Sequence, residues 1–260
     1  MSWFTPTCPL DSEDKEWIEN AFQWLIDELG MEILHSLKVV LPTDEFFPDP
    51  FSGSKSDILK MVERVCNYMD VDPDLVEIRF FTNEDGTNLH PLAGSESSQH
   101  ALGTYQMRGG KYRIRLETSQ AANPQVLAAT VAHELGHVIL LGEDRLNPDY
   151  ADHEPMTDLL TVYYGMGIFT ANSVFSFEQW TNTFAQGWQM NRRGYLSEEM
   201  FGYALALFAY VRGESKPAWA NYLQTNVKSY LKSSLKYLEK TGDTKIRRLN
   251  QPLTQPGDND

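Results

Sequence analysis

The spacing of apolar positions in the first part of the chain predicts a mixture of helices and strands. After a polar cap at residues 11 and 12, apolar side chains recur at helical intervals until Gly30, which predicts an amphipathic helix. Aliphatic and β-branched residues at 33–41 predict a strand. A second helix is expected at 57–69, and a buried strand at 76–82. These three elements would form a strand, helix, strand unit of α/β type.

The middle of the chain changes character twice. Residues 83–103 are rich in Gly, Ser, Asn, His and Pro, which is typical of a connection that is either mobile or functional, such as a lid over a site. Residues 104–108 and 112–117 alternate apolar and polar side chains around Gly109 and Gly110. This pattern predicts a β-hairpin.

The best defined helix is expected at about residues 124–141. Asn123 can cap its first turn, Pro124 suits its first position, and Gly142 suits a left-handed exit. Apolar residues surround this segment on nearly every side, so we expect it to be buried. Beyond it the chain is predominantly helical, at about 153–164, 197–212 and 217–240, and the tail from Thr241 is expected to be disordered.

Composition and charge narrow the class of protein. The 260 residues are 42% hydrophobic, enough for one large domain or two packed lobes. A formal net charge of −14 repels polyanions, so neither nucleic acid nor an anionic membrane is expected as a partner. The two cysteines, Cys8 and Cys66, form no disulfide framework and no thiolate zinc site. With no signal peptide or membrane-spanning run in the pattern, a cytoplasmic location is expected.

The candidate chemistry lies within the buried helix, in the run His133-Glu134-Leu135-Gly136-His137. A spacing of four residues places both imidazoles on one helix face, where they can reach one ion. Catalytic zinc needs three protein ligands and an open position for water. Glu134 would lie beside the metal, where it can take a proton from water held there. The alternative is a pair of core histidines hydrogen-bonded to backbone or carboxylate groups.

A third ligand is expected from the next helix, where Glu154 and Asp158 are again four residues apart. On one helix face, one carboxylate can bind the metal while the other accepts a hydrogen bond from a ligand imidazole. We assign Glu154 to the metal and Asp158 to the imidazole. The reverse assignment, with Asp158 on the metal and Glu154 at the helix terminus, stays open. His153 is a weaker candidate for a ligand or a transition-state donor.

This combination of motifs resembles the zincin metallopeptidases, and the Glu-x-x-x-Asp helix resembles their gluzincin branch. The matching residues are His133, Glu134, His137, Glu154 and Asp158. The sequence of residues 133–173 is also similar to that of a group of uncharacterised bacterial zincin-like proteins. This similarity does not indicate a substrate.

The resemblance implies an α+β fold with a cleft between two lobes. The first, residues 1–142, would carry a mixed sheet and the zinc helix at the cleft. The second, residues 143–245, would be mainly helical and carry the third ligand. The composition of residues 246–260 predicts a disordered tail. Residues 104–108 or 112–117 could then pair with an extended peptide substrate.

The resemblance also implies one zinc ion per chain and hydrolysis of peptide bonds in a peptide or protein substrate. Glu134 would take the proton of zinc-bound water and return it to the leaving amine. A donor to the oxyanion is expected as well, and spacing does not choose among its candidates, which are Tyr150, His153, Tyr163, Tyr164 and Tyr203.

The competing hypothesis is a non-catalytic, zinc-containing regulatory protein that binds a protein partner. Aromatic residues at 46–47 and 175–180, and a basic face of the last helix at Lys228, Lys232 and Lys236, would then form the binding surface. For the basic face, a solvated surface of an amphipathic helix is the simpler interpretation. An open coordination position on zinc would distinguish catalysis from a structural site.

Overall fold

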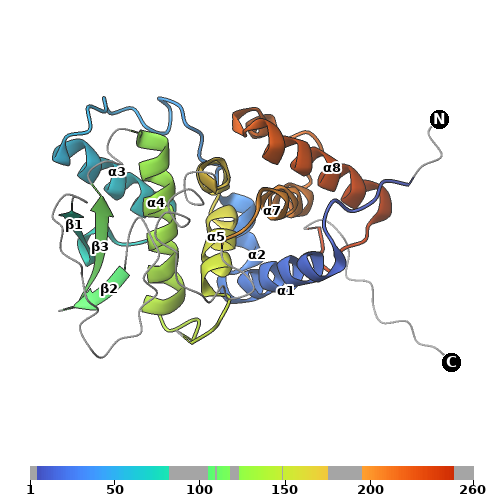
Figure 1. The fold of residues 1–260 in the computed structure, drawn as a ribbon, viewed down its shortest axis with the longest axis horizontal. Coiled ribbons are helices and arrows are strands. Elements are labelled where there is room, and N and C mark those ends of the chain that lie inside the picture. Colours follow the sequence, from blue (N-terminus) through green and yellow to red (C-terminus); the bar gives the residue numbers. More distant parts are fainter. Residues whose placement is uncertain are drawn as a thin grey trace, which may run out of the picture.

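The computed structural model describes residues 5–81, 105–108, 110–117, 123–147, 149–174 and 195–248. Helices dominate this part of the chain, together with one three-stranded sheet. In Figure 1 the sheet and α3 lie at one end of the molecule, α4 stands beside them, α5 follows, and α1, α7 and α8 form the other end. The expected mixture of helices with a small mixed sheet is therefore present, whereas the zincin-like arrangement stays a prediction.

The elements have the following bounds, with 3₁₀ and π segments given the letter η. They are α1 (Ser12–Leu29), α2 (Met31–Ser36), α3 (Lys55–Tyr68), η1 (Pro73–Leu75), β1 (Val76–Phe81), β2 (Tyr105–Arg108), β3 (Lys111–Glu117), α4 (Pro124–His137), η4 (Val138–Gly142), α5 (His153–Tyr163), an unlabelled helix at 167–174, α7 (Glu198–Val211), η5 (Ala218–Tyr222) and α8 (Thr225–Thr241).

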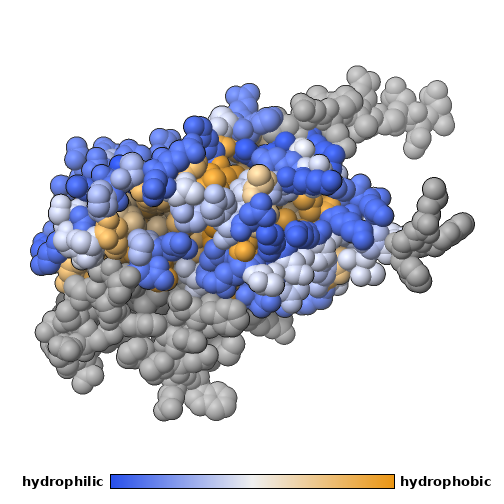
Figure 2. Space-filling view, turned by 90° about the horizontal axis from the view of Figure 1, so that it is seen from above, coloured by the Kyte–Doolittle hydropathy of each residue, from blue (hydrophilic) through white to orange (hydrophobic). Residues whose placement is uncertain are grey.

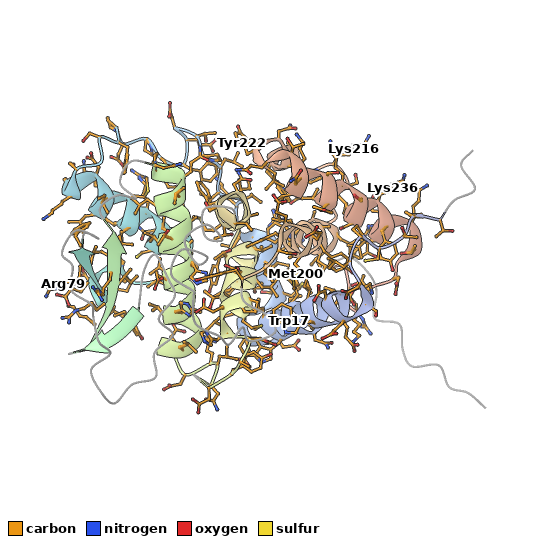
Figure 3. All side chains as sticks on the ribbon, in the orientation of Figure 1. Trp17, Arg79, Met200, Lys216, Tyr222 and Lys236 are labelled. Atoms are coloured by element: carbon orange, nitrogen blue, oxygen red, sulfur yellow. The ribbon has the colours of Figure 1, made fainter. Side chains whose placement is uncertain are left out.

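The sheet has the strand order β1-β3-β2 and contains both kinds of pairing. β1 runs parallel to β3, and β2 runs antiparallel to β3, so the predicted hairpin is confirmed. Ile114 and Leu116 of β3 are buried in the core. Arg113 points to the other face and donates to Glu77, which also pairs with Arg79 at the outer end of the molecule (Figure 3).

The helix that carries the motif begins where the sequence predicts. The side chain of Asn123 accepts hydrogen bonds from the backbone N–H groups of Gln125 and Val126, and Pro124 occupies the first turn. After His137 the chain continues as the π-helical turn η4 to Gly142. The predicted left-handed exit at Gly142 is wrong: the residue with positive φ is Asp144 (φ 55°), and aspartate tolerates this conformation because its short polar side chain can bond locally.

Residues 124–142 form one segment that is long and apolar enough to cross a membrane, judged by length and composition alone. Its residues from Leu127 to Leu140 are all buried among other side chains of the chain. A buried core helix passes the same test of length and composition, because other parts of the chain cover its apolar surface.

The helical end of the molecule is built around α7. α1 packs on α5 and α7, and α7 packs along α8. Gly202 allows this close approach, because a Cβ at this position would lie 2.3 Å from the Cβ of Tyr230. α1 thus lies with the helices that follow residue 142, although the sequence groups it with the sheet. The domain boundaries at 142 and 245 stay predictions.

The predicted strand at 33–41 is wrong, and with it the strand, helix, strand unit. Residues up to Ser36 form the short helix α2, with Leu34 buried and Ile33 exposed, and the following chain is extended without a strand partner. The backbone N–H of Val40 instead donates to the carbonyl of Gly165. A short apolar run is compatible with either a helix or a strand, and the tertiary contacts of this segment favour the helix.

The last predicted helix and the tail are also corrected. Residues 217–240 form the 3₁₀ helix η5 and then α8, because the chain is extended at Leu223 and Gln224. The described part of the tail is ordered: the N–H of Lys245 donates to the buried carboxylate of Glu19, and Ile246 is buried. The expectation of disorder from Thr241 is therefore not met at Lys245 and Ile246, and the tail boundary at residue 246 stays a prediction. Residues 249–260 lie outside the described residues.

The aromatic residues at 46–47 do not form an exposed patch. Phe46 is buried, and Phe47 packs its ring against Tyr68 and Phe169. Hydrophilic residues cover most of the described surface in Figure 2, with apolar residues visible in a band between them. Residues 83–103 and 175–180, to which the sequence also assigned functional possibilities, lie outside the described residues.

Candidate metal centre

The motif helix α4 and the helix α5 approach each other closely at Gly136. A Cβ built on Gly136 would lie 2.6 Å from Cγ2 of Thr157 and 3.4 Å from its backbone oxygen. The start of α5 is also held from the other side, because the indole N–H of Trp17 on α1 donates to Asp152 at 2.9 Å (Figure 3). This packing brings the first turns of α5 against the histidines of α4.

Gly136→Ala is expected to destabilise the fold. Overpacking of this kind costs about 1–3 kcal/mol, more than the roughly 1 kcal/mol that alanine gains over glycine within a helix. Thr157 cannot turn away easily, because it is buried and its hydroxyl is hydrogen-bonded to the carbonyl of His153. Urea unfolding followed by tryptophan fluorescence measures the loss.

The double variant Gly136→Ala/Thr157→Ser removes the obstructing methyl group and keeps the hydroxyl. It is expected to recover most of that loss when it is compared with Thr157→Ser alone. Equal losses with and without the methyl group would show that the α4–α5 contact is not what requires glycine at position 136.

Three side chains from these helices converge on one point. Oε2 of Glu154 lies 3.0 Å from Nε2 of His133 and 3.5 Å from Nε2 of His137. The ligand atoms of the three residues all lie within 4.8 Å of one another, and they are the group of described residues that can hold a metal ion. Two histidines of α4 and a glutamate of α5 thus form one set of donors.

The spacing of these donors fits a small divalent cation. Ligands at about 2.0–2.1 Å from a tetrahedral zinc ion are roughly 3.3 Å from one another. The two contacts of Glu154, at 3.0 and 3.5 Å, lie on either side of that value. Nitrogen and carboxylate donors suit zinc and several other divalent ions, so the geometry supports a metal ion without naming it.

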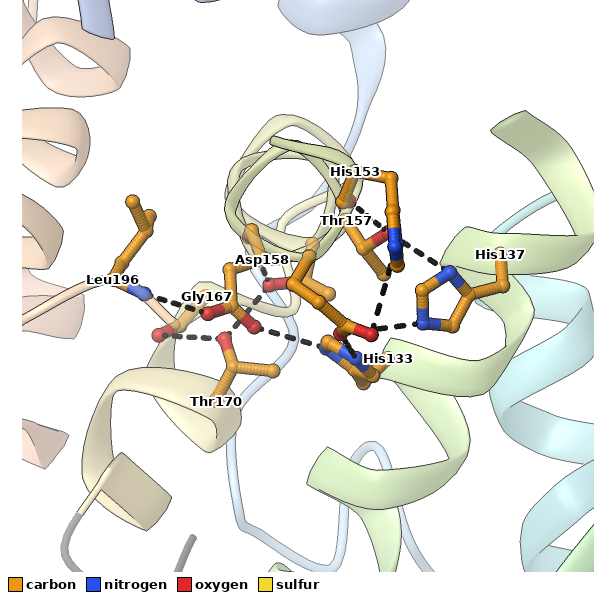
Figure 4. A network of polar contacts seen from close by, with 10 residues as sticks. His133, His137, His153, Thr157, Asp158, Gly167, Thr170 and Leu196 are labelled. Carbon is orange, nitrogen blue, oxygen red and sulfur yellow. Dashed lines mark hydrogen bonds and ion pairs between the residues drawn. The ribbon is translucent and has the colours of Figure 1, made fainter. Parts of the chain in front are cut away.

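Both imidazoles are oriented by a second contact on their other ring nitrogen (Figure 4). Nδ1 of His133 lies 2.9 Å from Oδ1 of Asp158, which can only accept. Nδ1 of His137 lies 3.3 Å from the hydroxyl of Thr157, which already donates to the carbonyl of His153 and so accepts from the imidazole. Each ring therefore carries a proton on Nδ1, and Nε2 is the nitrogen that faces Glu154 and can serve as a metal ligand.

Asp158 does not face the point where the donors converge. It lies on the Nδ1 side of His133, and its second oxygen accepts from the backbone N–H of Leu196 at 3.0 Å (Figure 4). The geometry thus favours Glu154 over Asp158 as the third donor. Asp158 connects the imidazole to the segment that leads into α7.

Asp158→Asn is expected to weaken metal binding by about 10–100-fold, the usual effect of changing a partner of a ligand imidazole. The amide is uncharged and cannot accept from both His133 and the N–H of Leu196. Competition with a zinc chelator measures the affinity, and Asp149→Asn, at an exposed position in the preceding turn, is the matched control. Equal affinities for the two variants would contradict the orienting role of Asp158.

Glu134 is buried beside these donors, with 1% of its surface exposed, and its Oε2 has no hydrogen-bond partner. Burial raises the pKa of this carboxyl group, although the neighbouring His137 and His133 act against the shift. An unpaired buried carboxylate is costly unless a cation or a ligand compensates for it. The position of Glu134 therefore suits an acid–base role that begins when a ligand is present.

The charges of the donors point to a place for a cation. Burial acts to lower the pKa of His133, but hydrogen bonds to Asp158 and Glu154 outweigh it and hold this pKa well above its usual value. Burial acts to raise the pKa of Glu154, but contacts with His133 and His137 hold it well below its usual value. Positive charge between His133 and Glu154 is thus favoured, and a metal ion can take the place of a proton there.

Two further side chains line the site. His153 lies beside Glu154, and its ring centroid is 5.8 Å from that of His137. Tyr195, which the sequence analysis missed, places its ring 5.4 Å from that of His133, and burial raises the pKa of its phenol. No spacing signal could have identified Tyr195, because it reaches the site through the tertiary packing of the segment that precedes α7.

Two of the other candidate oxyanion donors use their hydroxyl groups elsewhere. The hydroxyl of Tyr163 donates to the carbonyl of Gly30, and that of Tyr203 donates to Glu19. Tyr164 packs its ring against that of Tyr163, and Tyr150 is exposed. His153 is in contact with a donor residue of the site, since its Nδ1 lies 3.6 Å from Oε1 of Glu154.

No match was found for this chain among known protein families, curated proteins or solved structures. Function is therefore inferred from the geometry and chemistry of the site.

Proposed function

We propose that this chain is a zinc-dependent hydrolase, a metallopeptidase of the gluzincin-like zincin type. It would bind one zinc ion through His133, His137 and Glu154. The observation that carries the proposal is the buried carboxylate of Glu134, whose unpartnered oxygen lies beside a set of three donors. A base next to a cation site is the arrangement that metal-assisted hydrolysis requires.

A catalytic site is favoured over a structural one by the number of donors. Structural zinc is usually held by four protein ligands, whereas catalytic zinc has three and a position for water or substrate. Within the described ranges, the group of possible ligands contains three residues and no fourth. His153 is nearby but is not part of that group.

A pair of ordinary core histidines accounts for less of the geometry. Hydrogen bonds from His133 to two carboxylates would satisfy such a residue. They do not explain why Oε2 of Glu154 also approaches His137, or why Glu134 is buried without a partner for one oxygen. A cation and a reacting water molecule would account for both.

The chemistry of the proposed reaction is divided between the metal and the chain. Zinc bound at this site would act as a Lewis acid that polarises a carbonyl group and lowers the pKa of water. Glu134 accepts the proton of the attacking water and donates it to the leaving amine. Asp158 and Thr157 hold the two imidazoles in the orientation that presents Nε2.

The peptide substrate and the zincin type rest on the resemblance of the motifs. His133, Glu134 and His137, followed by Glu154 and Asp158, match the gluzincin pattern in order and spacing. The two-lobed zincin arrangement, the cytoplasmic location and the absence of nucleic-acid and membrane partners belong to the same proposal.

The direct test is cleavage of a random-peptide pool, followed by mass spectrometry of the products. The zinc-loaded protein is expected to generate new amino termini, the chelated protein to generate none, and zinc added back to restore cleavage. A pool that stays intact with the zinc-loaded protein would contradict the peptidase assignment, and zinc retained in that inactive protein would point to the non-catalytic alternative.

One observation favours that alternative, a zinc-containing protein that binds a partner. Lys232, Lys236 and Lys240 are exposed on α8 and form no hydrogen bond or ion pair with the described residues. Figure 3 shows Lys236 on the outer side of this helix, whereas Lys228 donates to Asn221. Such a basic row in a chain of net charge −14 can attract an acidic segment. It gives no role to Glu134, which is why the hydrolase is preferred.

A further inference from the structure

The carboxylate of Glu154 faces histidines on two sides. Its Oε2 approaches Nε2 of His133 and of His137, as described above. Its other oxygen, Oε1, lies 3.6 Å from Nδ1 of His153, the preceding residue on α5. One carboxylate group is therefore shared between an inner pair of histidines and a third histidine outside that pair.

Exposure to solvent differs between these residues. The side chains of His133 and His137 are 3% and 9% exposed, whereas those of Glu154 and His153 are 18% and 19% exposed. A cation arriving from solvent therefore meets Glu154 and His153 before it reaches the inner histidines.

His153 has an atom suited to receive such a cation. Its Nδ1 is buried and has no hydrogen-bond partner. The 3.6 Å to Glu154 is too long for a hydrogen bond. It is close to the roughly 3.3 Å that separates two ligands of one zinc ion. Two protein ligands bind a cation more weakly than three, which suits transient binding on the way to the metal centre.

We propose that His153 and Glu154 form an outer loading site through which a divalent cation reaches the metal centre. The cation is first held by Nδ1 of His153 and Oε1 of Glu154. It then moves to Oε2 of Glu154 and to the Nε2 atoms of the inner histidines while the carboxylate stays bound. This inference rests on the proposed metal centre, and it concerns the rate at which the centre fills.

The test is the rate of Zn²⁺ uptake by the metal-free protein, followed by stopped-flow competition with a fluorescent zinc chelator. His153→Gln is expected to slow uptake and release by the same factor, because the imidazole donor on the proposed entry route is lost. The dissociation constant at equilibrium stays the same, because the inner donors are unchanged. His35→Gln, which alters an exposed histidine of α2, is the matched control and loads at the wild-type rate.

Each other outcome overturns the inference. An unchanged uptake rate in His153→Gln would show that the cation reaches the inner donors by another route. A weaker equilibrium affinity with unchanged uptake would make His153 a ligand of the centre itself. His153→Ala, with the melting temperature measured beside each rate, separates loss of the imidazole from loss of fold. Absence of Zn²⁺ binding by the wild type would instead refute the proposed metal centre.

Discussion

Glu134→Gln is expected to lower the hydrolysis of a peptide substrate by about 10²–10⁴-fold, the usual contribution of a general acid–base residue. Glutamine has nearly the same shape as glutamate but cannot accept the proton of the attacking water. Because Glu134 is not one of the three donors, the zinc content should stay at the wild-type level. The measurements are kcat/KM for a peptide recovered from the cleaved pool, and zinc by elemental analysis.

The matched control for this variant is Glu143→Gln. Glu143 lies in the turn after η4, and its side chain is 42% exposed. Substitutions at such positions change stability by about 0.5 kcal/mol or less, so its activity should equal that of the wild type. Loss of zinc from Glu134→Gln, or activity within tenfold of the wild type, would contradict the assignment of Glu134 as the base.

Zinc is expected to raise the melting temperature by about 8–16 °C when it is present at 1,000 times its dissociation constant. Binding to the folded state alone contributes about 4 kcal/mol at that concentration, and in a chain of this size each kcal/mol corresponds to about 2–4 °C. The donors come from two helices and converge only after folding. Calorimetry with zinc and with chelator measures the shift.

His137→Ala tests whether this stabilisation comes from the proposed centre. The variant should have nearly the same melting temperature with zinc and with chelator, whatever its baseline stability. His35→Ala, in the exposed part of α2, should keep the wild-type shift. A full shift in His137→Ala would mean that zinc binds elsewhere on the chain.

Several elements were predictable because their signals are local. The cap at Asn123, the proline after it and the apolar residues around the helix define α4 without reference to other elements. The alternating pattern on either side of Gly109 and Gly110 in the sequence predicts the antiparallel pairing of β2 with β3. The four-residue spacings likewise place His133 beside His137 and Glu154 beside Asp158 on their helix faces.

Other features depend on tertiary contacts that no local pattern contains. Residues 33–41 match a strand in composition, but the burial of Leu34 and the bond from Val40 to Gly165 favour a short helix followed by extended chain. The choice of Glu154 over Asp158 depends on how α5 crosses α4 at Gly136. Tyr195 reaches His133 from the segment before α7, where the N–H of Leu196 donates to Asp158.

The central claim is tested most directly by the zinc content of the purified wild type and of His137→Ala after dialysis against metal-free buffer. One zinc ion per chain in the wild type, and a loss of most of it in the variant, is the predicted result. A wild type that retains no zinc, or a variant that retains as much as the wild type, would contradict the proposed centre.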